Sequence, residues 1–304
     1  MRSYRYLHFD VFTDHVFGGN QLAVVLDGRG LTDADMQAIA KEMSFSETTF
    51  LLPAEREGTD ARLRIFTPDE ELPMAGHPTI GSAFALARAG VLGPSHQRIV
   101  FGLGVGPTPV TLTWRGSDLT FAWMQQALPT FGEALADPGA AALALGLPEA
   151  AVRGTALPVQ VVSCGVPYLL VPVTSRRAVD NAELDRQAAG SLGRAVGIPG
   201  LAVYLFSPER ASDKATVYAR MFAPHAGIVE DPATGSAAGP LGCYLVRHNV
   251  VPPPKAGAMW CLQGVKMGRP SDLHIAIGLQ DDAITSVRVG GEAVLAGEGT
   301  LYVT

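Results

Sequence analysis

The chain has 304 residues, of which 47% are hydrophobic and 17% are charged. This composition is typical of a globular protein with a substantial core, built as one large domain or two of about 150 residues. The net charge of −6 argues against a nucleic-acid partner. The three cysteines (Cys164, Cys243 and Cys261) are too widely spaced for a disulfide framework or a zinc site. A reducing cytoplasm is therefore the simplest location, and no membrane association is expected because no apolar run is long enough to span a bilayer.

The first half of the chain alternates segments typical of strands with segments typical of helices. Thr32 stands where an N-cap belongs, directly before a predicted helix over 33–43. A second helix is predicted over 79–90, ending at a glycine. Strands are expected at 5–12, 21–27, 46–53 and 61–68, followed by a hairpin over 110–125.

The same order of elements returns in the second half. Residues 127–157 are rich in alanine, glycine and proline, and predict a linker with a short helix. Strands are then expected at 159–173, 201–206 and 215–222, with a helix near 181–196, a loop at 223–232 and a helix from Thr234 to Val246. Each half thus has the order strand, strand, helix, strand, strand, loop, helix. This order predicts an α+β protein with two similar lobes.

A seven-residue pattern occurs once in each half. The first copy is HPTIGSA (77–83) and the second is DPATGSA (231–237), so that Gly235 follows Gly81 by 154 residues. Proline, glycine, serine and alanine recur, and the first position is titratable in both copies. We therefore expect a duplicated fold in which the two segments face one another across a cleft that handles protons.

Each glycine-serine segment is predicted to lie at the start of a helix. The first turn of a helix has unpaired N–H groups and a partial positive charge, which suits a carboxylate or phosphate. Gly81, Ser82, Gly235 and Ser236 are therefore candidate ligands for an anionic substrate. The alternative is that the serines and the neighbouring threonines, including Thr234, are ordinary caps and that the glycines allow close packing.

Three ionisable residues are candidates for catalysis. Glu47 lies in FSETTF, where burial among aromatic residues would raise its pKa toward the range useful for acid–base chemistry. The alternative is an exposed position on an edge strand. His77 and Asp231 head the two repeated segments, although alone they could be a structural hydrogen-bonding residue and a helix-entry carboxylate. Asn20, in FGGN, is either a substrate ligand or a turn residue.

Several segments together resemble the phenazine-biosynthesis isomerase family. They are DVFTDHVFGGNQLAVV (10–25), SETTFLLP, RIFTPDEELPMAGHPTIGSAFAL (64–86), CGVPYLLVPV (164–173) and FAPHAGIVEDPATGSAAGPLGCYL (222–245). The resemblance implies two lobes, each a curled, barrel-like β-sheet around a central helix, as in diaminopimelate epimerase. The lobes would span 1–125 and 126–304, with a strand near 300–303 completing the first. It also implies a homodimer without cofactor or metal.

The resemblance further implies an isomerase that moves a proton within a small carboxylate such as a dihydro-hydroxyanthranilate. Glu47 would be the acid–base residue, and His77, Asp231 and Ser236 would hold the substrate and support proton transfer. Glu47, His77 and Asp231 form the expected catalytic set. The expected substrate-binding set is Asn20, Gly76, Gly81, Ser82, Thr234, Gly235 and Ser236.

Two other functions remain open from the sequence. One is a non-catalytic family member that binds a small acid or a protein partner, for which a desolvated Glu47 would have no use. The other is an epimerase that uses Glu47 or Asp231 as its bases, because the two cysteines of the related epimerases are missing from both repeated segments. The identity of the substrate is not encoded in the motifs.

Overall fold

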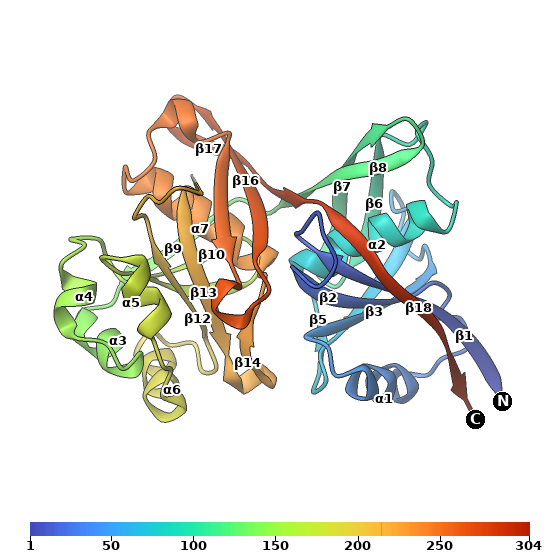
Figure 1. The fold of residues 1–304 in the computed structure, drawn as a ribbon, viewed down its shortest axis with the longest axis horizontal. Helices are drawn as coiled ribbons and strands as arrows, with labels where there is room; N and C mark the ends of the chain where they lie inside the picture. Colours follow the sequence, from blue (N-terminus) through green and yellow to red (C-terminus); the bar gives the residue numbers. More distant parts are fainter. Residues whose placement is uncertain (214) are drawn as a thin grey trace. The chain divides into compact units, whose positions relative to one another are not determined.

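The computed structural model describes residues 1–213 and 215–304. The chain forms two compact units, one of residues 1–125 and 288–304 and the other of residues 126–287. The returning segment is therefore longer than the strand near 300–303 that the sequence suggested. The reason is that β18 (Ala293–Val303) pairs antiparallel along the whole of β1 (Arg2–Val11), so that the chain ends lie side by side (Figure 1).

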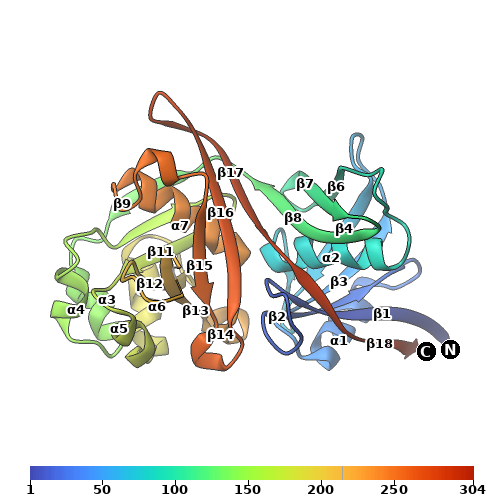
Figure 2. The same cartoon turned by 45° about the horizontal axis from the view of Figure 1, so that its top comes forward.

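The first unit is a curled sheet around one helix. Starting at β18, the strands pair in the order β1, β2, β3, β4, β6, β7 and β8, and β5 pairs with the edge of β4. Helix α2 (Gly76–Arg88) contacts β1, β2, β3, β7 and β18 and is buried from Gly76 to Leu86 (Figures 1 and 2). The strands are β2 (Asn20–Val25), β3 (Glu47–Pro53), β4 (Ala61–Phe66), β5 (Glu71–Leu72), β6 (Arg98–Leu103), β7 (Gly106–Arg115) and β8 (Asp118–Gln126).

Helix α1 (Asp33–Met43) lies against β3 and β4, and Met36, Ile39 and Ala40 join Phe50 and Phe66 in a small core. Thr32 caps this helix through a reciprocal capping box with Asp35, as its sequence predicts.

The second unit is also a sheet around one helix. Helix α7 (Gly235–Arg247) contacts β10, β11 and β16 and is buried from Gly235 to Val246. The short helices α3 to α6 pack against strands β10 to β13 in a separate apolar cluster. The strands are β9 (Thr130–Ala134), β10 (Gln160–Ser163), β11 (Pro167–Pro172), β12 (Ala202–Ser207), β13 (Val217–Ala223), β14 (Ile228–Asp231), β15 (Met259–Gln263), β16 (Ser271–Gln280) and β17 (Ala283–Gly291), and the helices are α3 (Pro138–Ala144), α4 (Glu149–Arg153), α5 (Arg176–Asn181) and α6 (Arg186–Ala195).

The strand pairings show that the two units repeat one topology. Antiparallel β1–β2 corresponds to β10–β11, parallel β2–β3 to β11–β12, and antiparallel β3–β4 to β12–β13. The series continues with parallel β4–β6 and β13–β15, and with antiparallel β6–β7 and β15–β16. The predicted α+β class and duplicated order of elements are confirmed.

The local structure differs from the predictions in two places. The stretch predicted as a linker with one short helix contains β9, α3 and α4, because Asp137 and the proline after it start a helix that alanine-rich packing then stabilises. The helix expected near 181–196 is α6, which Asp185 caps, and the additional helix α5, which Ser175 caps, precedes it.

Candidate active site

Glu47 and His77 form a buried pair in the first unit. Glu47 is the first residue of β3, and His77 lies in the first turn of α2. His77 Nε2 is 3.3 Å from Glu47 Oε2, and their side chains are only 3% and 8% exposed. The predicted burial of Glu47 is therefore correct, and the alternative of an exposed strand edge is wrong.

Burial determines the charge state of the imidazole in this pair. Burial lowers the pKa of His77 to about 3, although a hydrogen bond with the backbone of Gln21 opposes this shift. The imidazole is therefore neutral at physiological pH. The pair therefore places a buried carboxyl group within 3.3 Å of a neutral imidazole. Such a pair can support acid–base chemistry.

Asn20 contacts the ring nitrogen of His77 that does not face Glu47. It is the first residue of β2, is 1% exposed, and places its amide Nδ2 3.1 Å from His77 Nδ1. Because β2 and β3 run parallel and are neighbours, Asn20 and Glu47 both begin strands at the same edge of the sheet. The start of α2 reaches that edge at Gly76. The structure therefore brings together four of the residues predicted from sequence.

Gly81 and Ser82 have a different place from the one predicted. Helix α2 starts at Gly76, so both residues lie in its second turn, where backbone N–H groups are already paired within the helix. A Cβ on Gly81 would lie 2.5 Å from Leu22 and 2.7 Å from Val11, and Ser82 Oγ is 3.1 Å from Thr49 Oγ1 in the core. These two residues pack the helix against the sheet, and the prediction that they supply anion ligands is wrong.

The position of Gly81 and Ser82 differs from the prediction because the sequence repeat and the structural repeat have different offsets. The starts of α2 and α7, Gly76 and Gly235, are 159 residues apart, whereas the matching glycines of the two motifs are 154 apart. The motif begins inside the helix in the first unit and before it in the second. Only Gly235 and Ser236 lie in a first turn, as predicted for both copies.

In the second unit, Asp231 and Thr234 lie at the entrance to α7. Asp231 ends β14 and is 3% exposed, and the Thr234 hydroxyl donates a hydrogen bond to Asp231 Oδ2. Thr234 is the N-cap residue by position, yet its side chain makes no capping bond to the helix. The Thr234 hydroxyl thus holds the carboxylate of Asp231 in place of capping the helix.

Both central helices start without a side-chain cap. The N-cap positions of α2 and α7 are Ala75 and Thr234, and neither side chain accepts from the first turn. Helices α1, α3, α5 and α6 do have such caps. A helix start without a side-chain cap can bind an anion through its first-turn N–H groups.

Several supporting residues had no signal in the motifs. Tyr168 OH lies 2.6 Å from Ser236 Oγ. Arg220 makes two 2.8 Å hydrogen bonds to the carboxylate of Glu230, next to Asp231, and also donates to backbone carbonyls at the end of α5. Gln263 donates hydrogen bonds to the carbonyl of Asp231 and to the hydroxyl of Thr234, and it accepts one from the backbone N–H of Thr234. Tyr168 and Gln263 lie far along the chain from the residues that they contact, and only the folded structure reveals these contacts.

The cysteines lie away from both helix starts. Cys164 and Cys243 are buried with their sulfur atoms 3.9 Å apart, and Cys261 Sγ is 3.4 Å from Tyr204 OH. Burial raises the pKa of the Cys261 thiol to about 12, so it stays protonated. These thiols pack in the interior and do not provide the pair of bases that a thiol-dependent epimerase needs.

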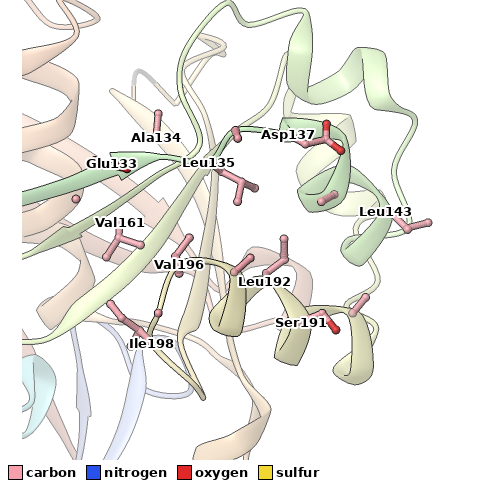
Figure 3. Close-up of a pocket in the computed structure, with 16 residues that line it drawn as sticks. Glu133, Ala134, Leu135, Asp137, Leu143, Val161, Ser191, Leu192, Val196 and Ile198 are labelled. Atoms are coloured by element: carbon pink, nitrogen blue, oxygen red, sulfur yellow. The ribbon is translucent and has the colours of Figure 1, made fainter.

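A cavity of about 920 Å³ lies elsewhere in the second unit. Leu135, Val161, Leu192 and Val196 line it, between β9, β10 and the helices α3 and α6 (Figure 3). It contains none of the predicted site residues. Within the described part of the chain, no helix has the length and apolar character that crossing a bilayer requires. Nor do those described residues gather three metal-ligating side chains into one cluster.

Comparison with known proteins shows a family match over most of the chain. Residues 9–299 match the family described as phenazine biosynthesis-like protein. The chain is 38% identical to the uncharacterized isomerase mll1393 of Mesorhizobium japonicum over the full length of both. It is 35% identical to the trans-2,3-dihydro-3-hydroxyanthranilate isomerase of Pseudomonas aeruginosa, covering 98% of this chain and 99% of that one.

A solved structure agrees with this assignment. The PhzF-family phenazine biosynthesis protein of Bacillus anthracis superposes with a TM-score of 0.86 at 26% identity, covering all of both chains. The resemblance read from the motifs is therefore confirmed. The chain belongs to the phenazine biosynthesis-like (PhzF) family and is an enzyme of the isomerase class.

Proposed function

We propose that this isomerase moves a proton within a small carboxylate-bearing substrate by general acid–base catalysis, without a bound cofactor. The observation that carries the proposal is the buried contact between Glu47 Oε2 and His77 Nε2 at 3.3 Å. A proton carrier must hold its proton in a defined place and release it to a substrate carbon. A buried carboxyl group beside a neutral imidazole meets this requirement.

In the proposed reaction, Glu47 takes a proton from one carbon of the substrate and returns a proton to another. His77 holds Glu47 in the reactive orientation and stabilises both the protonated and the ionised form of Glu47. Asn20 fixes the ring of His77 through the contact at Nδ1. The uncapped first turn of α2 accepts a negatively charged group of the substrate.

Asp231, Thr234, Gly235 and Ser236 of the second unit are proposed to bind polar groups of a substrate. The support is chemical: they present a fixed carboxylate, hydroxyl groups and a helix start without a side-chain cap, in the part of the topology that corresponds to the first site. A carboxylate suits a substrate amine or hydroxyl, and the N–H groups suit a substrate carboxylate. A dihydro-hydroxyanthranilate, which carries an amine, a hydroxyl and a carboxylate, is the first candidate because a relative at 35% identity is named for this substrate.

The test is direct. The purified full-length protein is incubated with trans-2,3-dihydro-3-hydroxyanthranilate, and proton NMR follows the positions of the ring hydrogens. The proposal expects the ring double bonds to move without net oxidation. Binding without any change would support a non-catalytic family member. Inversion at a carbon without movement of a double bond would show an epimerase, and either result would contradict the proposal for this substrate.

A further inference from the structure

Gln263, the last residue of β15, lies at the centre of the hydrogen bonds around the entrance to α7. Its side chain is fully buried. Its amide Nε2 donates to the carbonyl of Asp231 at 2.7 Å and to Thr234 Oγ1 at 3.0 Å. Its Oε1 accepts from the backbone N–H of Thr234 at 3.2 Å and from the hydroxyl of Tyr204 at 2.8 Å. The amide thus uses both donors and both acceptor positions.

Only one orientation of the Gln263 amide satisfies all of its hydrogen bonds. If the Gln263 amide were rotated by half a turn, its NH₂ group would face the N–H of Thr234, and its oxygen would face the carbonyl of Asp231. Both contacts would be repulsive. Burial raises the pKa of Tyr204 well above its ordinary value, so that its hydroxyl keeps the proton that it donates to Gln263.

This fixed amide sets the direction of the neighbouring hydroxyl. Thr234 Oγ1 accepts a hydrogen bond from Gln263 Nε2, so its single proton is free to point toward Asp231 Oδ2, to which it donates. The chain of donors therefore runs from Gln263 through Thr234 to the carboxylate of Asp231. Loss of the first donor would leave the Thr234 hydroxyl free to rotate and the carboxylate less firmly held.

Gly264, the next residue, holds the backbone at the same place. Its φ is +77°, and a Cβ at this position would lie 2.6 Å from the carbonyl oxygen of Pro232 and 2.3 Å from that of Arg269. Only glycine permits this approach of the chain to the Asp231–Pro232 segment. The side chain of Gln263 and the backbone of Gly264 therefore both contact the segment that carries Asp231.

We propose that Gln263 is a positioning residue for the isomerase reaction, acting through Thr234 to orient the carboxylate of Asp231. This inference rests on the proposed function, in which Asp231 contacts the substrate. Gln263 itself, fully buried among protein groups, does not contact the substrate. Its replacement is expected to impair the chemical step while substrate still binds, because misplacement of a substrate-orienting group lowers the rate more than the affinity.

The test compares two buried glutamines of the same unit. Gln263→Met keeps the volume of the side chain and removes its hydrogen bonds. Gln160→Met is the matched control, because Gln160 also donates to a backbone carbonyl, that of Gly132 at 2.7 Å, and bonds a side chain, His248. Gln263→Met is expected to lower kcat roughly 10- to 100-fold with a much smaller change in KM. Gln160→Met is expected to lower thermal stability and leave kcat unchanged.

A second arm separates positioning from general damage. In the Asp231→Asn background, Gln263→Met is expected to lower kcat little further, because both changes remove the same oriented carboxylate. Fully multiplicative losses, or a wild-type kcat in Gln263→Met, would overturn the inference. If Gln263→Met does not fold, Gln263→Leu, which also lacks a donor, takes its place in both arms.

Failure of the proposed function would appear differently, as no turnover by the wild-type protein. A crystal structure of the Gln263 variant then decides the inference. Rotated Thr234 and Asp231 side chains would support positioning by Gln263, and unchanged side chains would overturn it.

Discussion

His77 Nε2 lies 3.3 Å from Glu47 Oε2, in surroundings that leave their side chains only 3% and 8% exposed. The contact joins the first residue of β3 to the first turn of α2, so it depends on the curled sheet and its central helix. Its consequences can be measured in both stability and catalysis.

Stability should depend on pH through His77. Its pKa is about 3 in the folded protein and about 6.5 in an unfolded chain, because burial disfavours the charged ring. Between these values the unfolded state binds more protons, so the free energy of unfolding should rise with pH from about 3 to about 6.5 and then level off. Thermal denaturation across this range measures the slope.

The matched variants are His77→Gln and His96→Gln. Only the first removes a buried imidazole, since His96 is exposed. His77→Gln should flatten the dependence of Tm on pH relative to the wild type, and His96→Gln should retain it. An unchanged slope in His77→Gln would show that other groups cause the acid sensitivity.

Gly81→Ala should destabilise the protein by about 1–3 kcal/mol, the usual cost of inserting a methyl group into a filled core. The new Cβ would meet Leu22 and Val11 at less than 3 Å. Gly190→Ala on α6 is the control, because its Cβ would meet only Arg194 at 3.6 Å, and it should be neutral or stabilising. Denaturant unfolding measures both. Equal stabilities of the two variants would mean that the contact around Gly81 is not tight.

The sequence revealed the class of fold and most of the first site. Alternation and turn residues mark most strands, and Glu47 and His77, both predicted as site residues, lie 3.3 Å apart in the structure. The start of α2 was misplaced because proline and threonine at 78 and 79 are favoured both before a helix and in its first turn. Because the helix starts a few residues earlier than predicted, Gly81 and Ser82 lie in the core and not at the helix start.

The hydrogen-bonding partners could not be predicted from local patterns. Tyr168 meets Ser236 from 68 residues away, and Gln263 reaches Asp231 across 32 residues. Neither residue stands in a motif with its partner. Such contacts arise from strand pairing in the sheet of the second unit, which periodicity alone does not specify.

Asp231→Ala should lower kcat/KM by roughly 10- to 100-fold, the loss of one hydrogen bond to a charged group. The fold should persist, because Thr234 keeps its bonds to Gln263. Glu183→Ala, an exposed carboxylate of the same unit, is the control for loss of charge. Full activity in Asp231→Ala with a Tm lowered by several degrees would assign Asp231 a structural role instead.

Removal of metal ions should not affect turnover. The proposed proton transfer uses side chains alone, so dialysis against EDTA should leave kcat and KM unchanged. Readdition of magnesium, manganese or zinc should likewise have no effect. A loss of activity that one of these ions restores would contradict the cofactor-free part of the proposal.

The most direct test of the account is the kcat of Glu47→Gln with trans-2,3-dihydro-3-hydroxyanthranilate. The substitution keeps the shape of the side chain but removes its ability to carry a proton. Positioned acid–base groups contribute about 10²- to 10⁴-fold, so kcat should fall by at least about 100-fold, while Glu42→Gln on the exposed face of α1 should match the wild type. A Glu47→Gln enzyme that keeps more than about a tenth of the wild-type kcat would contradict the role of Glu47 as the proton carrier.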